Sequence, residues 1–265
     1  MNFKTFHRLI SEGFVFDGNM LKIDHTKPIQ DIFISLGLGY TKAHKPYITH
    51  HKSIPNVELV SAYQIDKKKV DRDTLMEVLL TLKGQGKHKI SPSDLDKLLS
   101  RSAEYLWKYL QSKKISTITY PQSSSALASQ FADKFQGRVS DTVLIPSAFK
   151  KSDPKMIRLD YESMALYKLS PKTIKALEDI IEKSKAKGSF KIHDVPTILR
   201  KFFNHFMEPS HINMLDKVEG KNILLVDDIL TSGSTTHEMI RIINEFQPNK
   251  IYVATLFRMK GSLSL

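Results

Sequence analysis

The chain has no cysteine among its 265 residues. Disulfide bonds, cysteine-ligated zinc sites and thiol nucleophiles are therefore excluded. The sequence also lacks a run of about 20 apolar residues, the length that spans a bilayer, and its first residues do not form the apolar segment of a secretory signal. We expect a cytoplasmic protein with no membrane partner.

Acidic residues are scarce relative to basic ones. The chain has 28 aspartates and glutamates against 40 lysines and arginines, which gives a formal net charge of +12. This charge favours anionic partners, whether nucleotides, pyrophosphate or nucleic acid, and does not distinguish among them. The apolar share of 41% and the charged share of 26% are typical of a globular protein.

The most informative stretch is residues 222–237, NILLVDDILTSGSTTH. Residues 223–226 form a continuous apolar run, which predicts a strand covered on both faces of a parallel sheet. Asp227 and Asp228 follow at the carboxyl end of the predicted strand, where open α/β sheets bind ligands. Two carboxylates in this position can accept hydrogen bonds from sugar hydroxyls or hold a hydrated magnesium ion.

The next residues form a short turn that is rich in hydroxyl groups. They are Thr231, Ser232, Gly233, Ser234 and Thr235. The glycine lets the backbone fold tightly and direct its amides to one point, and an apolar-periodic helix begins near Ser234 or Thr235 with its positive end at the turn. The turn is a candidate phosphate site, and with the acid pair it suits a ribose 5-phosphate. The alternative is an ordinary capped strand-to-helix turn.

This stretch resembles the signature of the type I phosphoribosyltransferases, a strand followed by V-D-D-x-x-T-x-G-x-T. The matching positions are Val226, Asp227, Asp228, Thr231, Gly233 and Thr235. The resemblance implies that the two aspartates hold the ribose hydroxyls of phosphoribosyl pyrophosphate (PRPP) together with Mg²⁺, and that residues 231–235 bind its 5-phosphate. It also implies transfer of the phosphoribosyl group to a nitrogenous acceptor with release of pyrophosphate.

A second strand-turn-helix unit lies earlier in the chain. Residues 115–120 predict a strand and residues 126–135 predict a helix, and the turn between them contains Gln122, Ser123, Ser124 and Ser125. In order and composition this turn resembles the pyrophosphate loop of the family, although the lysine or arginine that some members carry there is absent. A plain serine-capped helix is the alternative.

Residues 147–219 interrupt the alternation of strands and helices, and their length predicts a helical insertion. We expect its helices to start at about residues 170 and 194. The basic segment 149–158 predicts a mobile loop, and in the family such a loop closes over the site. By position Lys151 is our candidate catalytic cation, and Lys150, Lys155 and Arg158 are further candidates. Plain solvated side chains are the alternative for all four.

We interpret residues 1–90 as an N-terminal α+β appendage, a candidate hood, and residues 91–265 as the core. The appendage contains a predicted strand over residues 57–65 and a helix that ends near Gly84. This layout, with the last predicted strand at residues 250–256, is closest to ComF-like phosphoribosyltransferases. His44, His50 and His51 lie among lysines, and their spacing favours a solvated basic loop over a metal site.

The expected fold is therefore an α/β, parallel-sheet, type I phosphoribosyltransferase-like core with an N-terminal appendage and a helical insertion. The acceptor is not identified: hypoxanthine-guanine enzymes usually carry an aspartate near the base where this chain has Thr231, which disfavours a 6-oxopurine. The alternative function is a non-catalytic PRPP-sensing or nucleic-acid-associated protein, which the net charge and the lysine-rich stretches 42–52 and 183–191 support. The oligomeric state is left open.

Overall fold

The computed structural model of the chain describes residues 14–25, 47–50, 54–65, 72–123, 125–138, 141–210 and 216–259. Its centre is a seven-stranded sheet with the order β10-β7-β6-β11-β12-β4-β3. The strands are β3 Tyr47–His50, β4 Val57–Ile65, β6 Thr117–Pro121, β7 Val143–Lys151, β10 Met207–Pro209, β11 Asn222–Leu230 and β12 Lys250–Met259. The inner strands pair in parallel, whereas β10 and β3 pair antiparallel at the two edges. The predicted α/β fold with a parallel-sheet core is confirmed.

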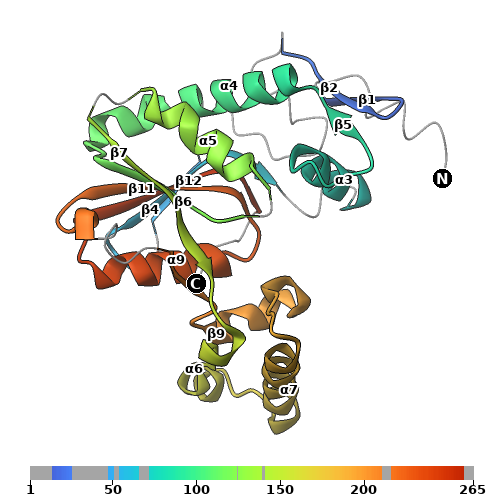
Figure 1. The fold of residues 1–265 in the computed structure, drawn as a ribbon, viewed down its shortest axis with the longest axis vertical. Coiled ribbons are helices and arrows are strands. Elements are labelled where there is room, and N and C mark those ends of the chain that lie inside the picture. The colour runs from blue at the N-terminus through green and yellow to red at the C-terminus, as the bar shows by residue number, and fades with distance from the viewer. Residues whose placement is uncertain are drawn as a thin grey trace.

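Different helices cover the two faces of the sheet (Figure 1). Helices α4 (Pro92–Leu110) and α5 (Leu127–Gln136) lie on one face, and α9 (Ser234–Glu245) lies on the other. In β11, Leu224 and Val226 join the core on the α4 and α5 side, while Ile223 and Leu225 join the core on the α9 side. Successive strand residues point to opposite faces, so a strand covered on both faces needs a continuous apolar run.

The helices begin and end at residues suited to those positions. Ser91 caps α4, because its side chain accepts a hydrogen bond of 3.0 Å from the amide of Asp94, and Pro92 occupies the first turn. Helix α3 (Arg72–Leu82) packs Leu75, Val78, Leu79 and Leu82 into the same core as α4. It stops at Gly84, whose φ of 69° lies in the left-handed region that favours glycine.

Strand β4 belongs to the core sheet and not to an appendage. It pairs in parallel with β12 from Val57, opposite Ile251, to Ile65, opposite Met259. The prediction that grouped residues 57–65 with the appendage is wrong for this strand, because a strand that is apolar on both faces is stable only when it pairs and is covered on both sides. β3 also belongs to the core sheet, whereas β1 (Phe14–Asp17) and β2 (Met20–Ile23) form a small separate sheet with β5 (Lys89–Ile90).

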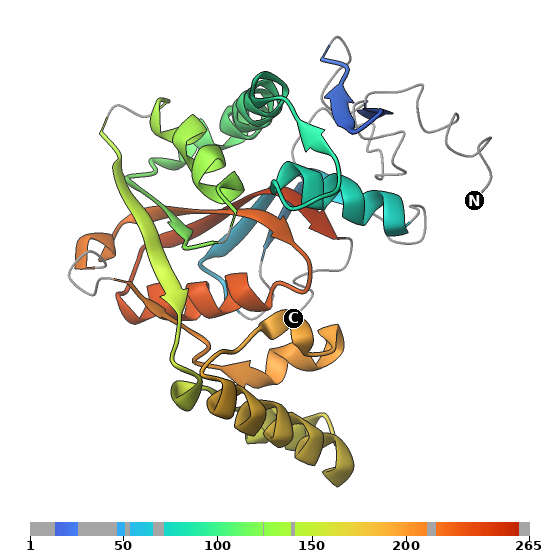
Figure 2. The ribbon, with the colours of Figure 1, turned by 45° about the vertical axis from the view of Figure 1, so that its right-hand side comes forward.

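Residues 153–206 form a lobe on the α9 side of the sheet (Figure 2). Its elements are η3 Pro154–Met156, β8 Arg158–Leu159, α6 Tyr161–Leu166, α7 Pro171–Lys187, η4 Ile192–Asp194, η5 Thr197–Phe202 and β9 Phe203–Asn204. The helix predicted at residue 170 is confirmed, and the Ser170 side chain caps α7 by accepting a 3.2 Å bond from the amide of Thr173. The helix predicted at about residue 194 is wrong. Pro196 interrupts the segment, and the chain forms two short 3₁₀ turns before β9 pairs with β8.

The lobe is tied to α9 through a buried glutamate. The Glu238 carboxylate accepts a 2.7 Å hydrogen bond from the amide of His205, between β9 and β10, and pairs with Arg241 at 3.0 Å. The histidine-rich segment at residues 42–52 lies outside the described residues except for β3. In the part of the chain that the structure describes, no helix combines the length and the apolar character needed to cross a membrane.

Candidate functional site

The acid pair lies within β11. The sequence predicts a strand that ends at Val226, but β11 continues to Leu230 because Ile229 and Leu230 also pair with β12. Both acids are buried: Asp227 is 9% exposed and Asp228 is 5% exposed. Isolated carboxylates are costly to bury, so each of these needs a compensating partner.

Two hydrogen bonds hold the Asp227 carboxylate. They come from the amide of Asp228 at 2.9 Å and from the hydroxyl of Thr236 at 3.1 Å. Burial, followed by the negative charge of Asp228, raises the pKa of Asp227 from 3.8 to about 7, against the opposing effects of these bonds and of Lys83. Perturbed carboxylates of this kind are concentrated at functional sites. The sequence motif did not include Thr236, which lies one position beyond its last matching residue.

A lysine from another element reaches the acid pair. The Lys83 Nζ lies 2.8 Å from Oδ2 of Asp228, and the two side chains are 25% and 8% exposed. Lys83 directly follows α3, far from the motif in the sequence. No sequence motif includes Lys83, and its only local signal is its place before the glycine-rich helix stop.

The turn after β11 has the backbone shape expected of an anion site. Gly233 has a φ of 81°, which favours glycine, and α9 begins at the next residue, as predicted. The hydroxyls of Ser232 and Ser234 lie 3.0 Å apart. Thr231 is exposed, while Thr235 is half-buried. Amides at a helix N-terminus can bind one phosphate group, and the assignment of residues 231–235 to this task stays a prediction.

The turn after β6 lies at the same edge of the sheet. β6 is the parallel neighbour of β11, with Thr119 in register with Leu225, so the carboxyl ends of both strands meet. The Ser123 hydroxyl accepts a 3.2 Å bond from the amide of Ser125, whose own hydroxyl accepts one of 3.2 Å from the amide of Leu127. These serines thus shape the turn. Gln122 is exposed, Ser124 lies outside the described residues, and a pyrophosphate role stays a prediction.

The basic segment at residues 149–158 is not the predicted mobile loop. Lys150 and Lys151 belong to β7, where β10 pairs with both residues, and Lys150 forms a 3.0 Å ion pair with Glu208. The prediction is wrong because the chain returns from the lobe as β10 and satisfies the backbone of β7. Lys151 is exposed, and its catalytic role stays a prediction.

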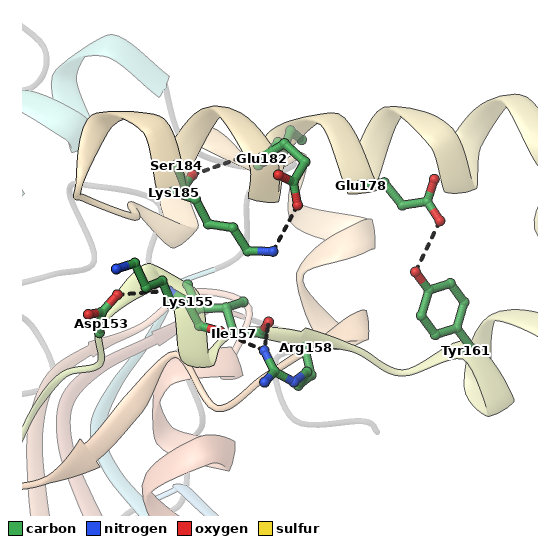
Figure 3. Close-up of polar contacts among 10 residues, drawn as sticks. Asp153, Lys155, Ile157, Arg158, Tyr161, Glu178, Glu182, Ser184 and Lys185 are labelled. Atoms are coloured by element: carbon green, nitrogen blue, oxygen red, sulfur yellow. Dashed lines mark hydrogen bonds and ion pairs between the residues drawn. The ribbon is translucent and has the colours of Figure 1, made fainter.

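The other two basic candidates make contacts inside the lobe (Figure 3). Arg158 donates hydrogen bonds to the backbone carbonyls of Lys155 at 2.6 Å and Ile157 at 3.1 Å. Nearby, the hydroxyl of Tyr161 donates a 3.0 Å bond to Glu178 of α7. The guanidinium of Arg158 therefore stabilises the segment that packs against α7.

The acid pair suits the ligand chemistry of Mg²⁺. This ion prefers oxygen donors and is usually held by one or two carboxylates together with waters and substrate phosphates. Asp227 and Asp228 supply two carboxylates beside a candidate phosphate turn. Among the described residues, no group of three or more His, Cys, Asp and Glu side chains is assembled that could hold a metal ion. Waters and substrate oxygens would complete the shell of a divalent cation held by these two carboxylates.

Comparison with known proteins identifies the domain type. Residues 164–263 match the family model of the phosphoribosyl transferase domain, a range that contains β11, the acid pair and α9. A stretch of 54 residues is 32% identical to a hypoxanthine-guanine phosphoribosyltransferase from Dictyostelium discoideum. This stretch is 20% of the chain and spans only 30% of that relative's length. The resemblance to type I phosphoribosyltransferases is confirmed, and the ComF-like layout stays a prediction.

Among the solved structures similar to this chain are two from thermophilic organisms. A purine phosphoribosyltransferase from Pyrococcus horikoshii is 11% identical, with a TM-score of 0.32 over 60% of this chain and 81% of that chain. The protein TT1426 from Thermus thermophilus is 14% identical, with a TM-score of 0.32 over 59% of this chain and 72% of that chain. Similarity at this level carries no information about a substrate.

Proposed function

We propose that this chain, which carries a phosphoribosyl transferase domain, binds PRPP together with Mg²⁺ and transfers the phosphoribosyl group to a nitrogenous acceptor, releasing pyrophosphate. The observation that carries the proposal is the meeting of three groups at one edge of the sheet. They are the buried acid pair, the turn at the N-terminus of α9 and the serine turn after β6. PRPP presents vicinal hydroxyls, a 5-phosphate and a diphosphate, which correspond to these groups in kind and number.

Each group has one task in the proposed reaction. Asp227 and Asp228 hold the ribose hydroxyls and the divalent cation, and the amides of residues 231–235 hold the 5-phosphate. Fixing both parts of the sugar keeps its anomeric carbon in place while the bond to the diphosphate breaks and the bond to nitrogen forms. Bound Mg²⁺ would neutralise charge on the departing pyrophosphate. Positioning and charge stabilisation would then supply most of the rate acceleration, because the transition state is oxocarbenium-like.

Two observations bear on the acceptor and point in different directions. The Dictyostelium discoideum relative is named for hypoxanthine and guanine. Thr231, however, replaces the aspartate that such enzymes usually place near the base, and its side chain is exposed. A test of the acceptor therefore needs 6-oxopurines, adenine and pyrimidines side by side.

Pyrophosphate release tests the proposal directly. The purified chain is incubated with PRPP, Mg²⁺ and each base of the panel, and pyrophosphate is measured. Release with at least one base, lost in Asp227→Asn/Asp228→Asn and kept in the exposed control Asp141→Asn, would support it. Calorimetric binding of PRPP without release by any base would favour the non-catalytic PRPP-binding alternative. No binding of PRPP at all would refute the proposal.

A further inference from the structure

The main chain of Lys83 is held rigidly at the end of α3. The amide of Lys83 donates to the carbonyl of Leu79 at 3.2 Å, and the amide of Gly84 donates to that of Thr81 at 3.0 Å. Gly86 packs so closely that an added Cβ would lie 2.5 Å from the Thr81 hydroxyl oxygen and 2.7 Å from its amide nitrogen. The turn therefore requires glycine at this position and has little freedom to move.

Glu77 fixes the other side of the same turn. Its carboxylate accepts hydrogen bonds from the amides of Lys87 at 2.7 Å and His88 at 3.1 Å, and it contacts the His88 imidazole at 2.9 Å. The buried leucines of α3 anchor the helix in the core. The backbone of Lys83 is thus fixed, while its four-carbon side chain can still redirect the ammonium group.

The acidic charges at this edge of the sheet outnumber the basic ones, which disfavours a negatively charged diphosphate. The acid pair contributes two carboxylates, and Lys83 contributes one ammonium in contact with Asp228. The serine turn at residues 122–125 contains no basic residue. A diphosphate bound beside this turn would add further negative charge, so it requires a cation from another element. Lys83 contacts Asp228 of β11, and β6, which carries the serine turn, is the parallel neighbour of β11.

We propose that Lys83 is a diphosphate-binding residue of the PRPP site. Its ammonium pairs with Asp228 in the ligand-free protein and donates to diphosphate oxygens when PRPP binds, and the divalent cation replaces it beside Asp228. The inference rests on the proposed function. Ammonium groups form strong charge-assisted hydrogen bonds with phosphates. The Lys83 side chain is 25% exposed, against 8% for Asp228, so solvent and a ligand reach the lysine more readily than the buried acid.

Lys83→Met tests this role when PRPP is compared with ribose 5-phosphate, which lacks the diphosphate. Calorimetry with Mg²⁺ should show PRPP affinity about 10- to 100-fold lower, the effect of losing a hydrogen bond between charged groups. Affinity for ribose 5-phosphate should be unchanged or higher, because the ammonium no longer competes for Asp228. Lys83→Arg should restore most of the PRPP affinity. Lys87→Met, in the same turn and exposed, is the matched control.

The outcomes separate this inference from its premise. If the wild-type chain does not bind PRPP, both the proposed function and the role of Lys83 are overturned. If the wild type binds PRPP and Lys83→Met keeps full affinity, only the role of Lys83 is overturned. If Lys83→Met lowers the affinity for PRPP and for ribose 5-phosphate equally, the diphosphate role of Lys83 is also overturned, because Lys83 would then only tie α3 to β11. A melting temperature without ligand, measured for each variant, identifies a general loss of folding.

Discussion

The buried Asp227 should make the ligand-free protein less stable as the pH rises. Its pKa is about 7 in the fold, against an ordinary value of 3.8. The pKa of Asp227 is higher in the folded than in the unfolded protein, so its protonation favours the folded state. This contribution to stability is fully present below the ordinary pKa of 3.8 and is lost as the pH rises through about 7. Protonation of Asp227 alone therefore contributes about 3 kcal/mol less to the free energy of unfolding at about pH 8 than at about pH 5.

Asp227→Asn should remove this loss with little change in shape. The amide oxygen can still accept from the amide of Asp228, and the Thr236 hydroxyl can rotate to accept from the new NH₂ group. Urea unfolding in EDTA at about pH 5 and about pH 8 measures the effect. The free energy of unfolding of the variant minus that of the wild type should increase by up to about 3 kcal/mol from about pH 5 to about pH 8. PRPP binding should be lost at both pH values.

Asp141→Asn, which removes one carboxylate at an exposed position, provides the control. A constant stability difference between Asp227→Asn and the wild type at both pH values would refute the reasoning. It would show that ionisation of Asp227 does not lower the free energy of unfolding, and that the single charge of Lys83 is enough to stabilise both carboxylates.

Three further outcomes are expected. PRPP affinity should be lost when Mg²⁺ is removed with EDTA, and calorimetry giving equal affinity would contradict a cation at the acid pair. Gly233→Ala should lower the free energy of unfolding by about 1 kcal/mol, because its φ of 81° is unfavourable for alanine, and should also weaken PRPP binding. Burial raises the pKa of Glu58, but the Tyr109 hydrogen bond and the Lys250 ion pair outweigh it, so the pKa lies below its usual value. Glu58→Gln should therefore cost about 1–3 kcal/mol near neutral pH and less in acid, where the wild type loses this contribution, as thermal unfolding across pH would show.

The motif region could be predicted from sequence because its signals are local. The apolar run of β11, the acid pair, Gly233 and the start of α9 follow one another within a few residues, and each has a direct backbone consequence. The contact between Lys83 and Asp228 could not be predicted in this way. It depends on how α3 packs against the sheet, which the pattern of either segment alone does not contain.

The errors have similar causes. The apolar spacing after Pro196 suits a helix, but the chain forms a 3₁₀ turn there and then pairs as β9 with β8. The basic segment around Lys151 has the composition of a loop, yet β10 comes back to pair with it. In both places a partner distant in sequence overrides the local preference.

The place of β4 in the sheet has a consequence for synthesis. β12 is the last of the seven strands to emerge from the ribosome, yet it lies between β11 and β4. The β3 and β4 pair is made much earlier and keeps one unpaired edge until β12 has been synthesised, so Val57 has no strand partner until Ile251 follows. Such distant pairing is slow to form, and an open edge of this kind attracts other chains. The nascent protein should therefore depend on chaperones for longer than its size alone would require.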